Sequence, residues 1–76
     1  MQELVEFLAK GLVDKPDEVR VERVERDGAV VLELHVAADD VGKVIGRQGR
    51  TARALRTIVR ASGARSNERA LLEIVG

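Results

Sequence analysis

The chain has 76 residues, 45% of them hydrophobic, with a net charge of zero, one aromatic residue (Phe7) and no cysteine. This length allows one small domain with an aliphatic core, and the absence of cysteine excludes disulfides and thiolate metal sites. No apolar stretch is long enough for a signal peptide or a membrane span, so we expect a cytoplasmic protein with no membrane partner.

The first predicted element is an amphipathic helix over Glu3 to Val13. Proline cannot continue a helix, so the sequence Asp14-Lys15-Pro16-Asp17 is expected to end it. The apolar side chains that recur at helical spacing are Leu4, Phe7, Leu8 and Leu12, with Val5 beside them.

Two strands joined by a tight turn are predicted next. The first, Glu18 to Arg26, changes face at Val24, so a bulge or strand end is expected near Arg23. Asp27-Gly28 is typical of a hairpin turn. The second strand, Ala29 to Ala37, alternates clearly, which gives the hairpin one core face and one largely solvated face. Its core-facing residues are Val30, Leu32, Leu34 and Val36.

Two helices interrupted by a pair of glycines follow the hairpin. Asp39 or Asp40 is expected to cap a short helix from Val41 to about Ile45, because its side-chain oxygen can accept from an unpaired amide. Gly46 to Gly49, which we call the glycine loop, separates this helix from a second amphipathic helix over Arg50 to Ser62.

The last elements complete a two-layer fold. Gly63 is expected to end the long helix, and Ala70 to Val75 reads as a final strand with Leu72 and Ile74 facing one way. The order α-β-β-α-α-β predicts a single α+β domain over residues 1–76. Its three-stranded sheet is covered on one face by three helices.

The glycine loop lies where the charge distribution changes. Residues 1–40 carry eleven acidic and five basic side chains, whereas residues 41–67 carry seven basic side chains and no acidic one. A glycine lets a ligand approach the backbone closely, and a helix start favours a phosphate oxygen. The segment therefore favours a polyanionic ligand, although a solvated, arginine-rich helix face would also explain the charge. The seven basic residues are Lys43, Arg47, Arg50, Arg53, Arg56, Arg60 and Arg65.

The stretch from Gly42 to Arg50, GKVIGRQGR, resembles the signature of the KH domain, in which a Gly-x-x-Gly loop clamps about four nucleotides of single-stranded nucleic acid. The element order matches the type II arrangement, and nearly the whole chain is similar to small bacterial single-KH RNA-binding proteins of the KhpA family. The resemblance implies non-catalytic binding of single-stranded or structured RNA. It also implies a homodimer, or a heterodimer with a second KH-containing protein.

The resemblance implies an RNA site formed by the glycine loop and its flanks. Its residues are Lys43, Val44, Ile45, Gly46, Arg47, Gln48, Gly49, Arg50, Thr51 and Arg53. Val44 and Ile45 are expected to form a floor for bases, and the opposite wall is expected near Leu34 to Val36. Aromatic stacking platforms, worth about 1–3 kcal/mol per base, are missing. We therefore expect weak binding by one domain and a gain from dimerisation.

Three alternative functions are less consistent with the sequence. A KH-fold scaffold that mainly pairs with another RNA-binding protein would not need the glycine pair, and a duplex-DNA helix-turn-helix fits the hairpin poorly. An enzyme is not expected, because His35 has no neighbouring nucleophile or carboxylate arrangement and helix capping accounts for Asp39-Asp40 better than a metal pair does. No catalytic residue, metal or cofactor is predicted.

Overall fold

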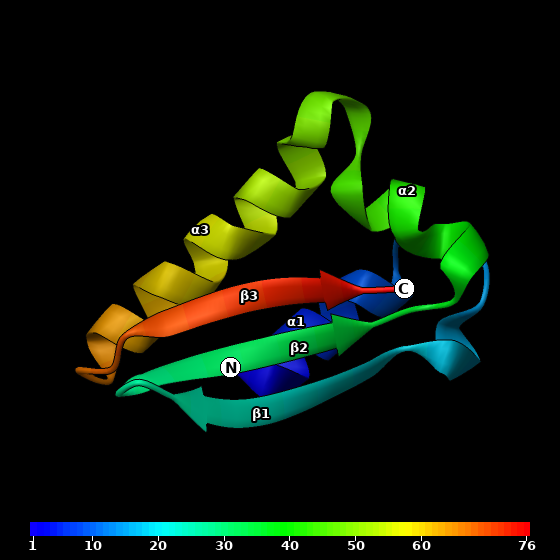
Figure 1. Cartoon of the computed structure of the whole chain (residues 1–76). Helices are drawn as coiled ribbons and strands as arrows, with labels where there is room; N and C mark the ends of the chain where they lie inside the picture. Colours follow the sequence, from blue (N-terminus) through cyan, green and yellow to red (C-terminus); the bar gives the residue numbers. More distant parts are fainter.

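The computed structural model describes all residues 1–76 and has the predicted α+β order (Figure 1). Its elements are α1 (Gln2–Lys10), β1 (Arg20–Arg26), β2 (Ala29–His35), α2 (Val41–Ile45), α3 (Arg50–Arg65) and β3 (Ala70–Val75). Short 3-10 turns at Pro16–Glu18, Ala38–Asp40 and Arg47–Gly49 connect them. None of the helices has the length and apolarity needed to cross a membrane.

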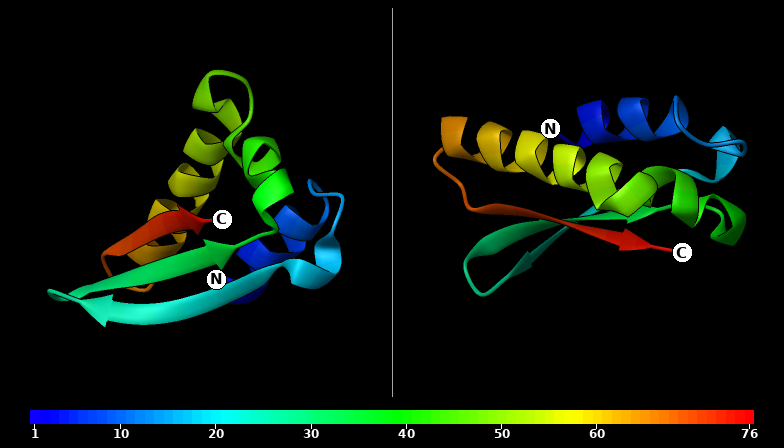
Figure 2. Two further views of the ribbon diagram at one scale, coloured as in Figure 1. Left: turned by 45° about the vertical axis from the view of Figure 1, so that its right-hand side comes forward. Right: turned by 90° about the horizontal axis from the view of Figure 1, so that it is seen from above.

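The sheet has the order β1-β2-β3, with β2 in the centre. β1 and β2 form an antiparallel hairpin, and β2 and β3 run parallel. A parallel pair needs a long crossover connection, which α2, the glycine loop and α3 provide. Figure 2 shows α1 and α3 on the same face of the sheet. β3 is an edge strand of the sheet, and it is the strand that contacts α3.

The core is a cluster of aliphatic side chains between the sheet and the helices. Its fully buried centre consists of Val5, Ala9, Leu32, Leu34, Val44 and Val59. The alternation predicted for β2 is confirmed, and Leu72 and Ile74 face the core from β3 as expected. The Asp27-Gly28 turn is also confirmed. Both of its residues have positive φ (51° and 77°), as a tight primed hairpin turn requires.

The predicted bulge near Arg23 is wrong, because β1 pairs with β2 one to one along its length. Val24 lies opposite Val31 on the face without helices. Val31 is nevertheless only 4% exposed. The Arg26 guanidinium crosses this face to reach Glu33 (3.6 Å) and Glu73 (3.1 Å). Val24 therefore points to this outer face and lies beside Val31 there, apart from the main core.

The first helix is shorter than predicted, and its apolar residues are distributed differently. It ends at Lys10, and Val5 and Ala9 are its buried residues. Leu4, Phe7 and Leu12 are 44%, 74% and 41% exposed. Val5 and Ala9 bring α1 close to β1 and β2, which leaves the larger side chains outside the core.

Two further expectations concern helix ends and are corrected. Gly63 does not end α3, which continues to Arg65. A Cβ at Gly63 would lie 2.6 Å from the Ala70 Cβ and 2.8 Å from the Glu68 carbonyl oxygen. Gly63 is therefore a close-packing residue between α3 and the start of β3. Asp40 is the N-cap of α2 by position, but its side chain makes no capping hydrogen bond there.

Candidate nucleic-acid interface

The glycine loop is the part of the chain that projects farthest from the sheet (Figure 1). Gly46 ends α2 with φ 76° and ψ 174°, Gln48 has φ 56°, and Gly49 has φ 74°. The Gly46 conformation belongs to a region that is essentially restricted to glycine, and the other two are left-handed. Three positive φ values within four residues turn the chain sharply from α2 into α3.

The two glycines are required for different reasons. A Cβ at Gly46 would overlap the Thr51 hydroxyl oxygen and lie 2.8 Å from the Thr51 Cβ. Gly46 is thus needed for packing within the protein, against a half-buried Thr51. A Cβ at Gly49 would meet no atom within 4 Å. The space beside Gly49 is therefore open to a ligand backbone.

Hydrogen bonds hold the loop in this shape. The Gly46 amide donates to the Gly42 carbonyl (2.9 Å), and the Gly49 amide donates to the Gly46 carbonyl (3.1 Å). The Arg53 guanidinium donates to the Gln48 carbonyl (3.0 Å). These bonds fix the strained backbone before any ligand arrives. Because Gly49 is the N-cap of α3, no side chain caps this helix start, which is the arrangement that favours an anion.

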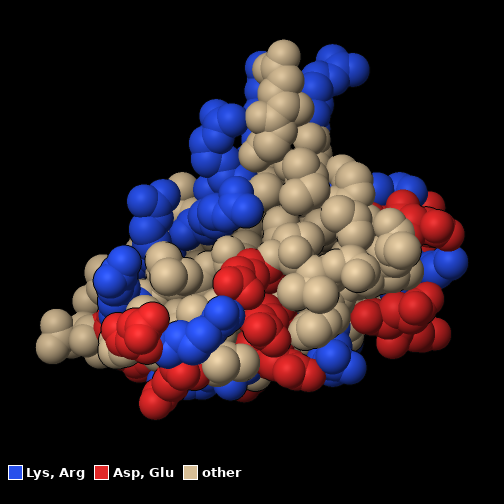
Figure 3. Space-filling model, viewed as in Figure 1, with Lys and Arg blue, Asp and Glu red and all other residues tan.

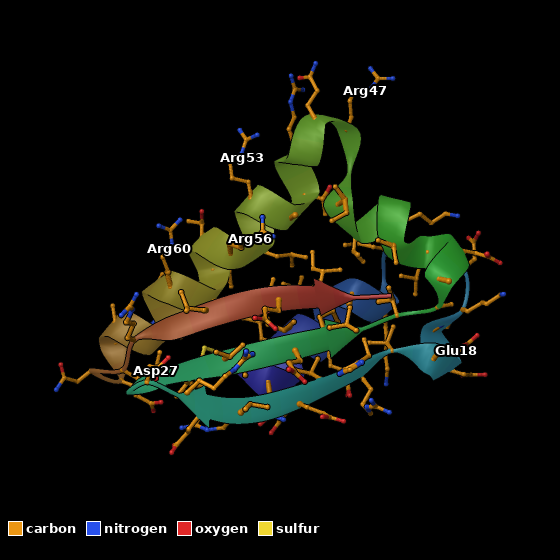
Figure 4. All side chains as sticks on the ribbon, in the orientation of Figure 1. Glu18, Asp27, Arg47, Arg53, Arg56 and Arg60 are labelled. Atoms are coloured by element: carbon orange, nitrogen blue, oxygen red, sulfur yellow. The ribbon has the colours of Figure 1, made fainter.

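The arginines around the loop have no acidic partners. Arg50 donates to the side-chain oxygen of Gln48 (3.2 Å), and none of the arginines from 47 to 65 forms an ion pair. In Figure 4, Arg47 projects from the loop, and Arg53, Arg56 and Arg60 follow one another down α3. Figure 3 shows these basic groups continuing from the loop along α3, with acidic groups gathered over the sheet. The basic residues that cluster in the sequence thus form a positively charged face of the molecule.

Lys43 differs from the arginines because it is already paired. Its ammonium group lies 2.7 Å from the Asp14 carboxylate and 3.7 Å from that of Asp40. The hydrogen bond and charge of Asp14 raise the pKa of Lys43 above 10.5. Lys43 is therefore charged at neutral pH, but the carboxylates of Asp14 and Asp40 partly offset its charge.

Asp40 anchors that same segment. It is 1% exposed, and its carboxylate accepts from the backbone amides of Asp14 (3.2 Å) and Lys15 (3.0 Å). Burial alone would raise the pKa of Asp40, but these amides and the nearby lysines lower it below its ordinary value. The carboxylate therefore stays ionised and ties the chain before β1 to the start of α2.

The apolar residues before the loop divide into one inner and one outer side chain. Val44 is fully buried in the core, so the prediction that it contacts a base is wrong. It supports the loop from inside. Ile45 is half-buried and can contact a ligand. The expected wall at Leu34 to Val36 is also wrong, because Leu34 is fully buried in the central strand. The strand that borders α3 is β3.

A hollow lies between α3 and β3, whereas the wall opposite the glycine-loop helices was expected on the second strand. It has a volume of about 420 Å³. Its lining residues are Arg56, Arg60, Ala70, Leu71, Leu72 and Glu73. The spacing of Arg56 and Arg60 was visible in the sequence, but only the parallel pairing of β2 and β3 reveals which strand lies beside them.

One group of side chains has metal-ligating chemistry. Glu22, Glu33 and His35 lie on the face of the sheet without helices, with their ligand atoms within 4.8 Å of one another. Arg20 pairs with Glu22 (2.9 Å), and Arg26 pairs with Glu33 (3.6 Å). The expectation that His35 has no neighbouring carboxylates is therefore wrong, since Glu33 lies 3.6 Å from its Nε2. Because arginines already pair with both carboxylates, this group is an ion-pair network on a half-exposed sheet face.

Comparison with known proteins agrees with this architecture. A family model described as KhpA/KhpB, KH domain, matches residues 2–74. The chain is 49% identical over 75 residues to the RNA-binding protein KhpA of Clostridium perfringens, which covers 99% of this chain and 100% of that protein. It is 52% identical over 73 residues to the RNA-binding protein KhpA of Borreliella burgdorferi, covering 96% and 89%. The corresponding protein of Aquifex aeolicus is 51% identical over 75 residues, covering 99% and 95%.

Proposed function

The chain belongs to the KhpA/KhpB family of KH-domain proteins, and we propose that it binds single-stranded RNA without catalysis through the glycine loop and the start of α3. The observation that carries this proposal is the uncapped helix start beside Gly49, surrounded by arginines without acidic partners. The name of its relatives, RNA-binding protein KhpA, supports the same ligand.

The residues of the site have distinct roles in this proposal. Gly49 and the first amides of α3 hold a phosphate, because no side chain separates them from the ligand. Arg47 and Gln48 reach phosphates or 2′-hydroxyls from the loop. Arg50 and Arg53 add charge and hold Gln48 in place, and Ile45 supports a base. Gly46, Val44 and Thr51 keep the loop in shape from inside, and Lys43 adds charge at its margin.

The test replaces the two residues at the loop tip, Arg47→Asp with Gln48→Asp. Binding of single-stranded RNA, structured RNA and duplex DNA is measured across salt concentrations. We expect RNA affinity to fall with salt and to be largely lost in the variant, with unchanged circular dichroism. The control, Arg20→Asp with Gln2→Asp, makes the same change in charge away from the loop and should bind normally. Unchanged RNA binding by the loop variant would refute the assignment, and a preference for duplex DNA would support the helix-turn-helix alternative.

We also propose that the protein forms a homodimer through α1. Leu4 and Phe7 on this helix and Leu12 just after its end are exposed apolar side chains, and Phe7 is the only aromatic residue. A second copy fits these side chains because α1 carries Glu3 in its first turn and Lys10 in its last. An antiparallel pair around a two-fold axis places each glutamate near the partner's lysine. One short helix buries less than the roughly 800 Å² per partner of a stable interface, so the dimer should be weak.

Sedimentation velocity over a concentration series tests the dimer. The wild-type protein should self-associate reversibly, and Phe7→Asp or Leu12→Asp should stay monomeric. Leu71→Asp is the matched control, since Leu71 is also 41% exposed but lies on β3. Equal association of all variants would place the interface elsewhere. Clean dimerisation without any RNA binding would favour the alternative function, a scaffold that pairs with another RNA-binding protein.

A further inference from the structure

Lys43 is the one cation of the proposed RNA site that already has acidic partners. It lies in α2, about one helical turn before Gly46, the first residue of the glycine loop. Its ammonium group is 2.7 Å from the Asp14 carboxylate, which is the shortest ion pair of the protein. The arginines of the loop and of the start of α3 form no ion pair. A phosphate beside the loop therefore meets free arginines and an occupied lysine.

The segment between α1 and β1 carries Asp14 past the start of α2 (Figure 1). The Asp14 and Lys15 amides donate to the buried carboxylate of Asp40, which directly precedes α2. The Asp14 side chain is 75% exposed, and its carboxylate has Lys43 as its only partner. An exposed ion pair contributes little to stability. The position of Asp14 is therefore set by Asp40, whereas its carboxylate acts mainly on the charge of Lys43.

The other acidic side chains of this region are placed differently. Asp39 pairs with Lys15 (3.2 Å), and Asp17 forms no ion pair. Asp40 is 3.7 Å from Lys43, but both of its oxygens accept backbone amides. Asp14 is thus the one exposed carboxylate in contact with the ammonium group of Lys43.

A carboxylate and a phosphate compete for the same ammonium group. Lys43 contacts a phosphate oxygen either by leaving Asp14, which loses the ion pair, or by holding both anions, which places two negative charges close together. Both arrangements lower the affinity for RNA. The hydrogen bond and charge of Asp14 are the largest causes of the raised pKa of Lys43, so the contact that a phosphate must replace is a favourable one.

We propose that Asp14 limits the RNA affinity of this protein, because its carboxylate competes with an RNA phosphate for the Lys43 ammonium group and the ion pair opens when RNA binds. The inference rests on the proposed RNA-binding function and adds a residue that lies outside the RNA site. Since coupling between two contacts is reciprocal, bound RNA in turn releases the Asp14 side chain. The phosphate contact of Lys43 thus carries a cost that the contacts of the free arginines do not have.

The test is a double-mutant cycle, measured by fluorescence anisotropy with single-stranded RNAs of uridine, adenosine or cytidine at a temperature where every variant is folded. Asp14→Asn should bind about fivefold more tightly at low salt, the factor for two unit charges about 4 Å apart in water. Its slope of log affinity against log salt should be steeper by about 0.7, the value of one further phosphate contact. In a Lys43→Gln background, Asp14→Asn should change the affinity by less than about twofold.

Asp17→Asn is the matched control, because it removes the same charge from the same segment without touching Lys43, and it should leave the affinity nearly unchanged. NMR adds a readout that a merely structural role of Asp14 would not move. RNA should shift the side-chain carboxyl carbon of Asp14 as its partner leaves, while the Asp14 and Lys15 amides, which stay bonded to Asp40, should shift little.

The outcomes separate this competition from the proposed function. Equal gains from Asp14→Asn and Asp17→Asn, no gain from either, or an undiminished gain in the Lys43→Gln background would overturn the competition and leave the loop assignment intact. If the Arg47→Asp, Gln48→Asp variant binds RNA normally, a gain from Asp14→Asn that depends on Lys43 would still support the competition although the loop assignment fails. Absence of RNA binding by both the wild type and Asp14→Asn would overturn both proposals.

Discussion

Substitution of Gly49 by alanine separates the ligand role of the loop from its role in the fold. Gly49 has φ 74°, and a Cβ there would meet no atom of the protein within 4 Å. The folded state therefore loses only the cost of a left-handed alanine, about 1–2 kcal/mol. For a domain of this size the unfolding midpoint should fall by roughly 5–15 °C. RNA affinity should fall at least tenfold, because the new methyl group occupies the space in which the phosphate lies.

Gly28 provides a matched control for Gly49. Its φ is 77°, and a Cβ there would also meet nothing within 4 Å. Its neighbour Asp27 lies far from Arg47 (Figure 4). Gly28→Ala should lower the midpoint by a similar amount, within about 1 kcal/mol, and leave RNA affinity within twofold. Thermal unfolding and RNA titration of both variants, at a temperature where both are folded, provide the comparison. Equal RNA affinities would refute the proposal that the backbone at Gly49 contacts the ligand.

Three further predictions concern the packing and charges that support the loop. Gly63→Ala should destabilise the protein by about 1–3 kcal/mol through overpacking, and Ala70→Gly should partly rescue it in chemical denaturation, because one of the two close contacts is removed. Asp40→Asn should lower the unfolding midpoint at pH 7. Folding lowers the pKa of Asp40 below 3.8. The ionised carboxylate therefore stabilises the folded protein above pH 3.8, and this stabilisation is lost as the pH falls through the lowered pKa of the folded state. Asp40→Asn should consequently lose less stability than the wild type on acidification. Asp14 raises the pKa of Lys43 above 10.5, so Asp14→Asn should be less stable than wild type at neutral pH, and the difference should disappear in alkaline unfolding curves as Lys43 deprotonates.

Local patterns predicted the elements well where one cause determined them. The alternation of β2, the Asp27-Gly28 turn and the bounds of α2 and β3 follow from periodicity and turn chemistry, and all four agree with the structure. The errors occurred where packing between distant residues decides. Gly63 was expected to end a helix, but its close contact with Ala70 lies across a loop and has no local sign.

The candidate site was predictable in its loop and not in its walls. The order of elements and the Gly-x-x-Gly spacing identified the glycine loop and the arginines beside it. The burial of Val44 and the position of β3 beside α3 depend on tertiary packing and on sheet order. Neither follows from periodicity, because Val44 and Ile45 are equally apolar neighbours and the sequence does not say which of them faces the core.

The number of phosphates bound should decide the affinity of this protein, because it has almost no aromatic surface for stacking. Each phosphate contact with a single strand adds about −0.7 to the slope of log affinity against log salt. Four contacts at the loop predict a loss of roughly 50-fold between 50 and 200 mM salt. Each further phosphate contact along the arginines of α3 would raise that loss by about 2.6-fold. Salt titration with RNAs of increasing length therefore counts the contacts, and a slope that stays the same from 4 to 12 nucleotides would confine binding to the loop.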